Sequence, residues 1–278
     1  MKRKELFAVL EKLDMHPSKS LGQNFLVDEN CLDALVRDAA PAAGEAVLEV
    51  GPGMGALTRR LLAAGCQVTA VEFDSRLAAY LREELGGEER LRLRQEDACK
   101  TDYDALFPPG TPYRCIANLP YSCASVILGR MTSAANPPRS LHVLLQKEMA
   151  ERLAATPGTP QYGLLTVRLA FQYLPRVTRM VPRGVFFPPP EVDSAFLALE
   201  ARETPLAEPA VRERAGKLAA AAFSQRRKQT RKLLEPLLPK VDVAKVLEEM
   251  GLPATARAEN LTPQQYIQLA QLPHGYPS

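Results

Sequence analysis

The feature that most constrains the fold of this chain is a glycine-rich turn, Gly51-Pro52-Gly53-Met54-Gly55, which directly follows a short apolar run at residues 47–50. A short apolar run before glycines is typical of a buried strand, and the pattern at residues 56–64 predicts a helix. Glycines in such a turn let the backbone approach a ligand closely at the helix N-terminus. A tight turn without a ligand would use the same glycines, so the turn alone does not define a function.

Short apolar runs continue to alternate with helical patterns over residues 1–200. Strands alternating with helices indicate βαβ units and a mainly parallel, Rossmann-like α/β sheet. The predicted helices are residues 56–64 and 77–85. The predicted strands are residues 47–50, 68–72, 91–95, 115–118, 141–145, 164–174 and 195–199.

The strands stop after Glu200, where a polar stretch broken by proline begins. Helical patterns follow at residues 208–235 and 242–250, and Thr262-Pro263 is a typical helix start. We therefore expect two domains, a large one at residues 1–200 and a small helical one at residues 201–278.

Two acidic residues extend the pattern of the glycine turn. Glu72 ends the second predicted strand, 19 residues beyond Gly53, and Asp97 follows the third. A carboxylate in the first position can accept hydrogen bonds from ribose hydroxyls, and one in the second can accept from an adenine amine. Capping of the following helices is the alternative for both acids. Together with the turn they favour a nucleoside-bearing cofactor, and a dehydrogenase remains an alternative at this point, although the spacing is GxGxG rather than GxGxxG.

The segment Asn118-Leu119-Pro120-Tyr121 follows the fourth predicted strand, at the sheet edge where such folds bind ligands. Its chemistry suits an amino group on an aromatic ring, whose nitrogen lone pair is delocalised. The Asn118 side-chain oxygen and the Leu119 carbonyl can each accept one N–H, Pro120 stiffens the turn, and Tyr121 can stack on the base. A simple strand-end turn is the alternative.

With these motifs in order, the sequence resembles the ribosomal RNA adenine dimethyltransferase family, and specifically its bacterial small-subunit type. The resemblance covers nearly the whole chain. Its segments are Leu21-Gly22-Gln23-Asn24-Phe25-Leu26-Val27-Asp28, residues 49–55, Glu72, Asp97, residues 118–121, Gln146-Lys147-Glu148, Pro157-Gly158, Tyr162-Gly163, residues 186–194 and residues 222–228. The departure is Ser122-Cys123 after Tyr121, where an Asn-Ile type pair is usual.

The resemblance implies a class I methyltransferase sheet and S-adenosylmethionine as cofactor. It implies transfer of two methyl groups to N6 of each of two adjacent adenosines near the 3′ end of small-subunit ribosomal RNA, in ribosome biogenesis. The implied cofactor contacts are Gln23, Asn24, Leu26, Glu49, Gly51, Gly53, Gly55, Glu72, Asp97, Ala98 and Asn118. The implied residues at the target base are Asn118, Leu119, Pro120, Tyr121, Phe186 and Phe187.

Phe186 and Phe187 lie in a Pro-rich loop that the family places beside the target base. We expect one ring to sandwich the extruded base against Tyr121 and the other to belong to the core.

A basic cluster marks the candidate RNA-binding region. Arg227, Lys228, Arg231 and Lys232 have the spacing of one helical face. With the neighbouring Arg226, and with Arg212, Arg214 and Lys217, they can track phosphates, whereas a solvated helix face is the alternative reading. The whole-chain net charge of +3 carries no such information.

Three remaining expectations concern location and rival functions. The five scattered cysteines show no zinc-site spacing, so we expect free thiols, no metal and a cytoplasmic protein without a membrane span. We expect a monomer that acts on an immature ribosomal subunit. The alternatives are a large-subunit enzyme of the macrolide-resistance type, a DNA adenine methyltransferase, which lacks support from a base-reading domain, and an RNA-binding assembly factor in which methylation is secondary.

Overall fold

The computed structural model describes residues 3–18 and 22–272. It contains two compact units, each with its own hydrophobic core. The first unit holds the described residues up to Ala150 together with Arg176–Glu200, and the second holds Glu151–Pro175 together with the described residues from Ala201 onward.

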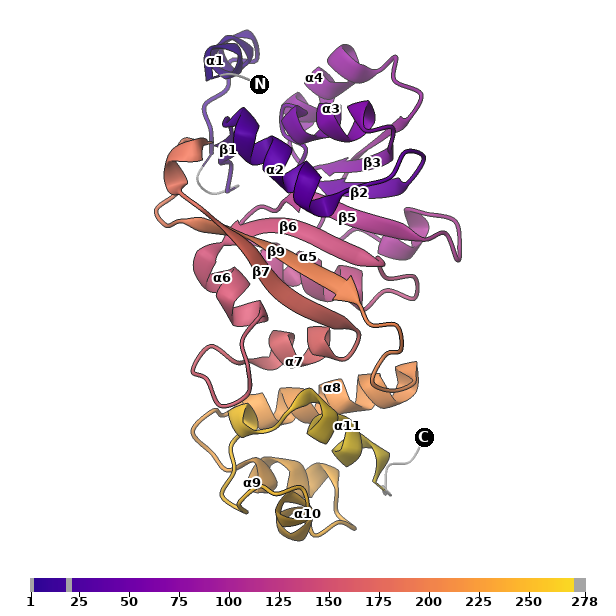
Figure 1. The fold of residues 1–278 in the computed structure, drawn as a ribbon, viewed down its shortest axis with the longest axis vertical. Helices are drawn as coiled ribbons and strands as arrows, with labels where there is room; N and C mark the ends of the chain where they lie inside the picture. Colours follow the sequence, from indigo (N-terminus) through magenta and orange to yellow (C-terminus); the bar gives the residue numbers. More distant parts are fainter. Residues whose placement is uncertain (1–2, 19–21, 273–278) are drawn as a thin grey trace. The chain divides into compact units, whose positions relative to one another are not determined.

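The first unit is built on a seven-stranded sheet with the strand order β4-β3-β2-β5-β6-β9-β7 (Figure 1). Neighbouring strands from β4 to β6 pair in parallel, and β9 pairs with β6 antiparallel. This arrangement confirms the predicted Rossmann-like sheet. The strands are β2 (Ala46–Val50), β3 (Gln67–Glu72), β4 (Leu91–Gln95), β5 (Tyr113–Asn118), β6 (Ser140–Gln146), β7 (Tyr173–Val181) and β9 (Ser194–Ala201).

Helices flank this sheet, and a separate two-stranded ribbon joins the N-terminal segment to the Pro-rich loop. In that ribbon Phe25 lies opposite Phe187 and Leu26 opposite Phe186. The helices are α1 (Arg3–Lys12), α2 (Glu29–Ala39), α3 (Ala56–Ala63), α4 (Ser75–Leu85), α5 (Ala124–Thr132) and α6 (Lys147–Leu153), with short 3₁₀ turns η1 (Tyr103–Ala105) and η2 (Arg183–Val185); the ribbon strands are β1 (Phe25–Leu26) and β8 (Phe186–Phe187).

The second unit is helical, and it begins earlier in the chain than the predicted boundary at residue 201. Tyr162, Val167 and Phe171 share one buried core with the C-terminal helices, so residues 151–175 belong with the tail. Its elements are α7 (Leu164–Ala170), α8 (Pro209–Phe223), α9 (Thr230–Leu234), η3 (Glu235–Leu237), α10 (Val243–Glu249), η4 (Ala258–Asn260) and α11 (Pro263–Gln271).

Two secondary-structure predictions in this region are wrong. Residues 164–170 form helix α7 rather than a strand, because a helix buried among other helices is apolar on most sides and resembles a buried strand in sequence. The helix predicted at residues 208–235 is interrupted at residues 224–229. There the backbone N–H of Thr230 donates to the Ala256 carbonyl at 2.8 Å, a tertiary bond that replaces a helical one. The predicted cap at Thr262 is confirmed, since its hydroxyl accepts from the N–H of Gln265.

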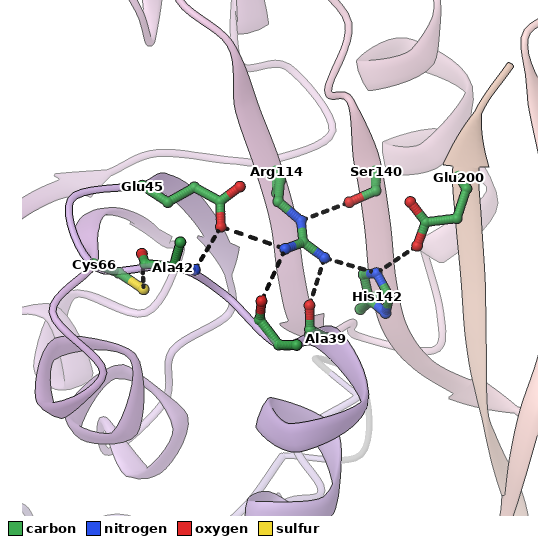
Figure 2. Close-up of polar contacts among 9 residues, drawn as sticks. Ala39, Ala42, Glu45, Cys66, Arg114, Ser140, His142 and Glu200 are labelled. Carbon is green, nitrogen blue, oxygen red and sulfur yellow. Dashed lines mark hydrogen bonds and ion pairs between the residues drawn. The ribbon is translucent and has the colours of Figure 1, made fainter. Parts of the chain in front are cut away.

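The amino edge of the sheet is held by Arg114, a largely buried side chain that is 15% exposed (Figure 2). The Arg114 guanidinium of β5 donates to Ser140 Oγ on β6 at 2.7 Å and to the Ala39 carbonyl at the end of α2 at 2.6 Å. It also contacts Glu45 at 3.3 Å and Nε2 of His142 at 3.0 Å. Burial lowers the pKa of His142. Arg114 therefore links two strands and a helix end, at the edge opposite the strand ends Glu72 and Asn118.

We expect Arg114→Met to lower the free energy of unfolding by about 2–4 kcal/mol, because it leaves carbonyl and carboxylate groups without their buried partner. Urea unfolding measures this loss, with cofactor affinity unchanged. The control is Arg179→Met: Arg179 pairs with Asp38 at 3.2 Å but its side chain is 46% exposed, so about 0–1 kcal/mol is expected. Equal effects of the two variants would contradict the assigned role of Arg114.

Candidate active site

A cavity of about 270 Å³ opens at the carboxyl edge of the sheet. β2 pairs with β3 along its whole length to Val50, but its pairing with β5 stops at Leu48 opposite Cys115. From β2 the chain adds β3 and β4 on one side and β5 and β6 on the other, so the strand order reverses between β2 and β5. Ligands of open α/β sheets bind at such a point. The cavity includes most residues singled out in the sequence: Gln23, Asn24, Leu26, Glu49, Gly51, Gly53, Glu72, Asp97, Ala98, Asn118, Leu119, Pro120 and Tyr121.

All three glycines of the turn have a positive φ, but they do not all line the cavity. Gly51 and Gly53 line the cavity with φ of +70° and +58°, a backbone conformation that side chains disfavour. Gly55 does not line the cavity, and a Cβ there would lie 2.9 Å from Leu81 Cδ2 of α4. Gly55 also has a φ of +78°, so its backbone favours glycine as well, but it lies beside α4 rather than beside the cofactor as the sequence places it.

Glu72 organises the glycine turn. Its two carboxylate oxygens accept from the backbone N–H of Gly53 at 3.0 Å and of Asp74 at 2.9 Å. The residue is 6% exposed, and burial raises its pKa, which the two backbone hydrogen bonds oppose. A carboxylate has about four lone-pair sites, so capacity for a ligand hydroxyl remains.

Glu49 lies deeper than Glu72 and is 2% exposed. Its carboxyl accepts from Thr58 Oγ1 at 2.7 Å. Burial raises its pKa to about 8, and the hydrogen bond from Thr58 only partly offsets this. Glu49 therefore holds a proton at neutral pH and forms an uncharged wall of the cavity.

Asp97 both lines the cavity and caps the turn that follows it. Its Oδ1 accepts from the N–H of Cys99 at 2.9 Å, and Oδ2 lies 3.7 Å from Lys100 Nζ. Both expected roles are therefore compatible with its position. Phe73, which follows Glu72, also lines the cavity and is 58% exposed. Phe73 is not among the residues predicted from the sequence, although an aromatic residue directly after a strand-end acid indicates such a position.

The N-terminal segment forms another side of the cavity. Gln23 Nε2 donates to Asp74 Oδ2 at 3.2 Å, and the Asn24 carbonyl accepts from Asn118 Nδ2 at 3.3 Å. These two bonds connect the segment to the loops after β3 and β5. Leu21, the first residue of the motif quoted above, lies outside the described residues.

Asn118 lines the cavity, and its side chain has a buried acceptor without a partner among the described residues. Its Nδ2 is bound to the Asn24 carbonyl, whereas its buried Oδ1 has no hydrogen-bond partner. An orphaned buried acceptor is costly, so a ligand N–H is the partner that its chemistry requires. The acceptor, the glycine turn and the two strand-end acids fit a nucleoside cofactor beside an amine.

Tyr121 and the Phe pair are arranged more specifically than their sequence indicates. Tyr121 shares a 2.7 Å hydrogen bond with Ser194 Oγ, and burial raises its pKa to about 12. The fully buried ring of Phe186 lies 6.3 Å from the Tyr121 ring, at an interplanar angle of 76°. The Phe187 ring instead packs on Phe7 of α1. Neither phenylalanine is among the cavity-lining residues.

The unusual pair Ser122-Cys123 also lines the cavity. Cys123 occupies the N-cap position of α5, and its Sγ lies 3.8 Å from the Pro120 carbonyl. The departure from the family pattern is therefore at the cavity wall itself.

The predicted basic helical face is not formed. Arg226, Arg227 and Lys228 lie in the turn between α8 and α9, while Arg231 and Lys232 lie in α9. The Arg226 guanidinium donates to the carbonyls of Pro160 at 2.9 Å and Tyr162 at 3.0 Å, which stabilises the helix break. Arg227, Lys228 and Lys232 are exposed and Arg231 is half-buried.

The additional basic residues named with the cluster are engaged within the second unit. Arg214 donates to the carbonyls of Ala270 at 2.6 Å and Leu272 at 3.1 Å, and Lys217 pairs with Glu213 at 2.8 Å. Burial lowers the pKa of Arg212. Arg214 therefore links α8 to the end of α11, whereas the exposed Lys217 pairs only within α8.

The parallel sheet, the glycine turn, the strand-end acids and the Asn-Leu-Pro-Tyr segment define an S-adenosylmethionine-dependent methyltransferase of class I. Residues 16–273 match the family described as ribosomal RNA adenine dimethylase, and the chain belongs to this family. It is an enzyme that dimethylates adenine in ribosomal RNA with S-adenosylmethionine as methyl donor.

Named relatives agree with this assignment. The chain is 41% identical to ribosomal RNA small subunit methyltransferase A of Brucella anthropi, with 94% of each chain covered. It is 38% identical to the protein of the same name from Cupriavidus necator, with 94% and 93% covered.

Two solved structures resemble the whole chain. A dimethyladenosine transferase from Plasmodium falciparum has a TM-score of 0.73 and 25% identity, covering 88% of this chain and 95% of that one. The 23S rRNA methyltransferase ErmE has a TM-score of 0.69 and 29% identity, covering 89% and 98%. Within residues 3–18 and 22–272, no helix is long and apolar enough to cross a membrane.

Proposed function

We propose that the enzyme transfers two methyl groups to N6 of each of two adjacent adenosines near the 3′ end of small-subunit ribosomal RNA. Its substrate is an immature small subunit, and it acts as a monomer in the cytoplasm. The observation that carries the acceptor chemistry is the unpartnered Asn118 Oδ1 at the cavity between β2 and β5. The names of the relatives from Brucella anthropi and Cupriavidus necator support the small subunit over the large-subunit alternative.

In the proposed mechanism Asn118 Oδ1 and the Leu119 carbonyl each accept one N–H of the adenine amine. Two fixed acceptors turn the amine so that its nitrogen lone pair points out of the ring conjugation and toward the methyl donor. The bound cofactor supplies an intrinsically reactive sulfonium methyl group. Alignment by this chain therefore matters more than a strong general base: the proton that the methyl group displaces from the nitrogen passes to water, and in the second transfer the one remaining N–H binds one of the two acceptors.

The remaining site residues hold the two nucleosides. Glu72 accepts from the ribose hydroxyls and Asp97 from the adenine amine of the cofactor, while Gly51 and Gly53 allow its close approach to the turn. Tyr121 stacks on the target base, with its ring orientation fixed by the 2.7 Å bond to Ser194. Phe186 lies edge-on to Tyr121 and is fully buried, so in this proposal it supports the Tyr121 ring, and it covers the second side of the base only after it becomes accessible.

We further propose that Arg227, Lys228, Arg231 and Lys232 contact RNA phosphates. Arg226 is excluded from this proposal because its guanidinium is bound to two carbonyls. Phosphate contacts supply most of the affinity without selecting a sequence.

The double variant Arg227→Ala/Lys228→Ala is expected to weaken RNA binding and to lower the log–log salt slope by roughly 0.7–0.9 per lost contact. Cofactor affinity should not change. Filter binding across a salt series measures the slope. The matched control is Lys217→Ala/Lys245→Ala, which removes two cations that already pair with Glu213 and Glu249. An unchanged slope in the first variant would assign these residues to an ordinary solvated surface.

The deciding test of the proposed function is mass spectrometry of small-subunit ribosomal RNA from cells with and without the protein. Loss of two adjacent dimethyladenosines near the 3′ end, restored by the wild-type protein, is the expected result. Dimethyladenosine lost from the large-subunit RNA instead would reject the small-subunit assignment. If an inactive variant restores subunit assembly as well as wild type does, the assembly-factor alternative is favoured.

A further inference from the structure

The N-terminal helix α1 lies at the rim of the acceptor cavity. Leu6 is buried, and its side chain is one of the cavity walls. At the other end of α1, Lys12 donates to Glu83 of α4 at 2.8 Å, and its Nζ lies 5.8 Å from the centroid of the Tyr80 ring. These contacts fix the helix beside the cavity.

Directly next to Leu6, Phe7 faces outward. It is 46% exposed, and its ring centroid lies 4.7 Å from that of Phe187 at an interplanar angle of 72°. The Arg3 guanidinium lies 5.7 Å from the centroid of the Phe187 ring. Arg3 and Phe7 are four residues apart on the helix, so both project on the side that meets Phe187.

The cluster Arg3, Phe7 and Phe187 has the composition of a base-stacking site. Aromatic faces and guanidinium planes are the groups on which unstacked bases rest in single-stranded nucleic-acid sites. A purely structural anchor would bury its large ring, yet nearly half of Phe7 is exposed. Phe187 is fixed by β8, which pairs with β1 at the cavity, so the cluster is continuous with the acceptor site.

We propose that Phe7, with Phe187 and Arg3, binds the RNA base adjacent to the adenine being methylated. The inference rests on the proposed function, because extrusion of one adenine leaves its neighbour without a stacking partner. Leu6 lines the cavity, and Phe7, the next residue of α1, lies outside it. The two sites are therefore adjacent. Arg3 and Lys4, both exposed on α1, add positive charge for the intervening phosphate.

The test compares Phe7→Ala, Phe7→Leu and Phe7→Tyr in the full-length protein with unmethylated small subunits as substrate. Phe7→Ala and Phe7→Leu are expected to raise the KM for the subunit roughly five- to thirtyfold, the lower half of the range for one base–aromatic stack. The kcat at saturating subunit and the affinity for S-adenosylhomocysteine stay unchanged, and Phe7→Tyr retains the wild-type KM. The matched control is Met180→Ala, which truncates another exposed apolar side chain, 53% exposed on β7.

A second measurement reports stacking without catalysis. A 3′-terminal small-subunit RNA hairpin carries 2-aminopurine beside the target adenosine, and its fluorescence is followed with saturating S-adenosylhomocysteine. Wild type and Phe7→Tyr should quench it, whereas Phe7→Ala and Phe7→Leu should not. Arg3→Gln should weaken quenching more than Arg37→Gln, an exposed cation of α2.

The outcomes separate the two proposals. If wild type methylates the subunits but Phe7→Leu matches it in KM and quenching, the stacking site is rejected while the proposed function stands. If Phe7→Ala lowers kcat or cofactor affinity instead of raising KM, α1 only supports the fold of the cavity. Failure of the wild-type protein to methylate small subunits rejects both proposals.

Discussion

Glu72→Ala is expected to weaken binding of S-adenosylhomocysteine by about 10- to 150-fold, the range for loss of one hydrogen bond to a charged group. Two effects act together. The ligand loses its acceptor for ribose hydroxyls, and the N–H groups of Gly53 and Asp74 lose the carboxylate that now holds the turn at 3.0 and 2.9 Å. Isothermal titration calorimetry measures the affinity directly.

Loss of the fold is not the expected cause of this weakening. Burial raises the pKa of Glu72 in the folded protein, so its ionisation opposes folding, and stability from this group falls as pH rises through the folded pKa. Removal of the buried carboxyl relieves this cost, which offsets the loss of its two backbone hydrogen bonds. Thermal unfolding should show a Tm near that of wild type, and Asp33→Ala, which removes a 56% exposed carboxylate from α2, should leave the affinity unchanged. Unaltered affinity in Glu72→Ala would show that Glu72 serves only to cap the turn.

The sequence was sufficient to predict those parts of the fold whose local pattern is compatible with only one type of secondary structure. The apolar runs that became β2, β3 and β5 are short, bounded by turn residues and separated by amphipathic helices, and this combination is typical of a buried parallel sheet. Residues 164–170 carry an equally apolar run, but the surrounding elements of the second unit are helices. Only the tertiary context distinguishes a buried helix from a buried strand there. The break at residues 224–229 likewise depends on a hydrogen bond to Ala256, 26 residues beyond Thr230.

At the site, sequence predicted which residues gather but not what each one contacts. The motifs follow successive strands, and parallel strands bring their carboxyl ends to one edge of the sheet. Glu72 and Asn118 therefore lie at the same edge and line one cavity. Gly55, by contrast, has a positive φ at the start of α3 and lies next to Leu81 of α4 rather than at the cavity, which the sequence does not reveal. Phe186 and Phe187 contact different rings because β8 pairs with β1 and neighbouring residues of a strand face opposite sides.

Asn118 is the residue from which we expect the largest effect on catalysis. The side-chain oxygen has no partner among the described residues, whereas Nδ2 is held by the Asn24 carbonyl at 3.3 Å. This fixed acceptor interacts most strongly when the amine nitrogen attacks and its N–H groups become more acidic. An interaction that strengthens in the transition state changes the rate rather than substrate binding. The exposed basic cluster, which we propose supplies most RNA affinity, belongs to the second unit.

Asn118→Ala is therefore expected to lower the single-turnover rate of methyl transfer about 10²–10³-fold, the usual effect of removing one oriented polar contact, while RNA affinity stays near that of wild type. Transfer to unmethylated small subunits is measured at saturating cofactor, because Asn118 also lines the cofactor cavity. Asn118→Asp keeps an acceptor and should retain more of the rate than the alanine variant. Asn136→Ala, which removes an amide bound to the Thr111 carbonyl outside the cavity, is the control. Near-normal turnover of Asn118→Ala would show that Asn118 is only a turn residue. It would also show that its side-chain oxygen is not the acceptor that orients the amine.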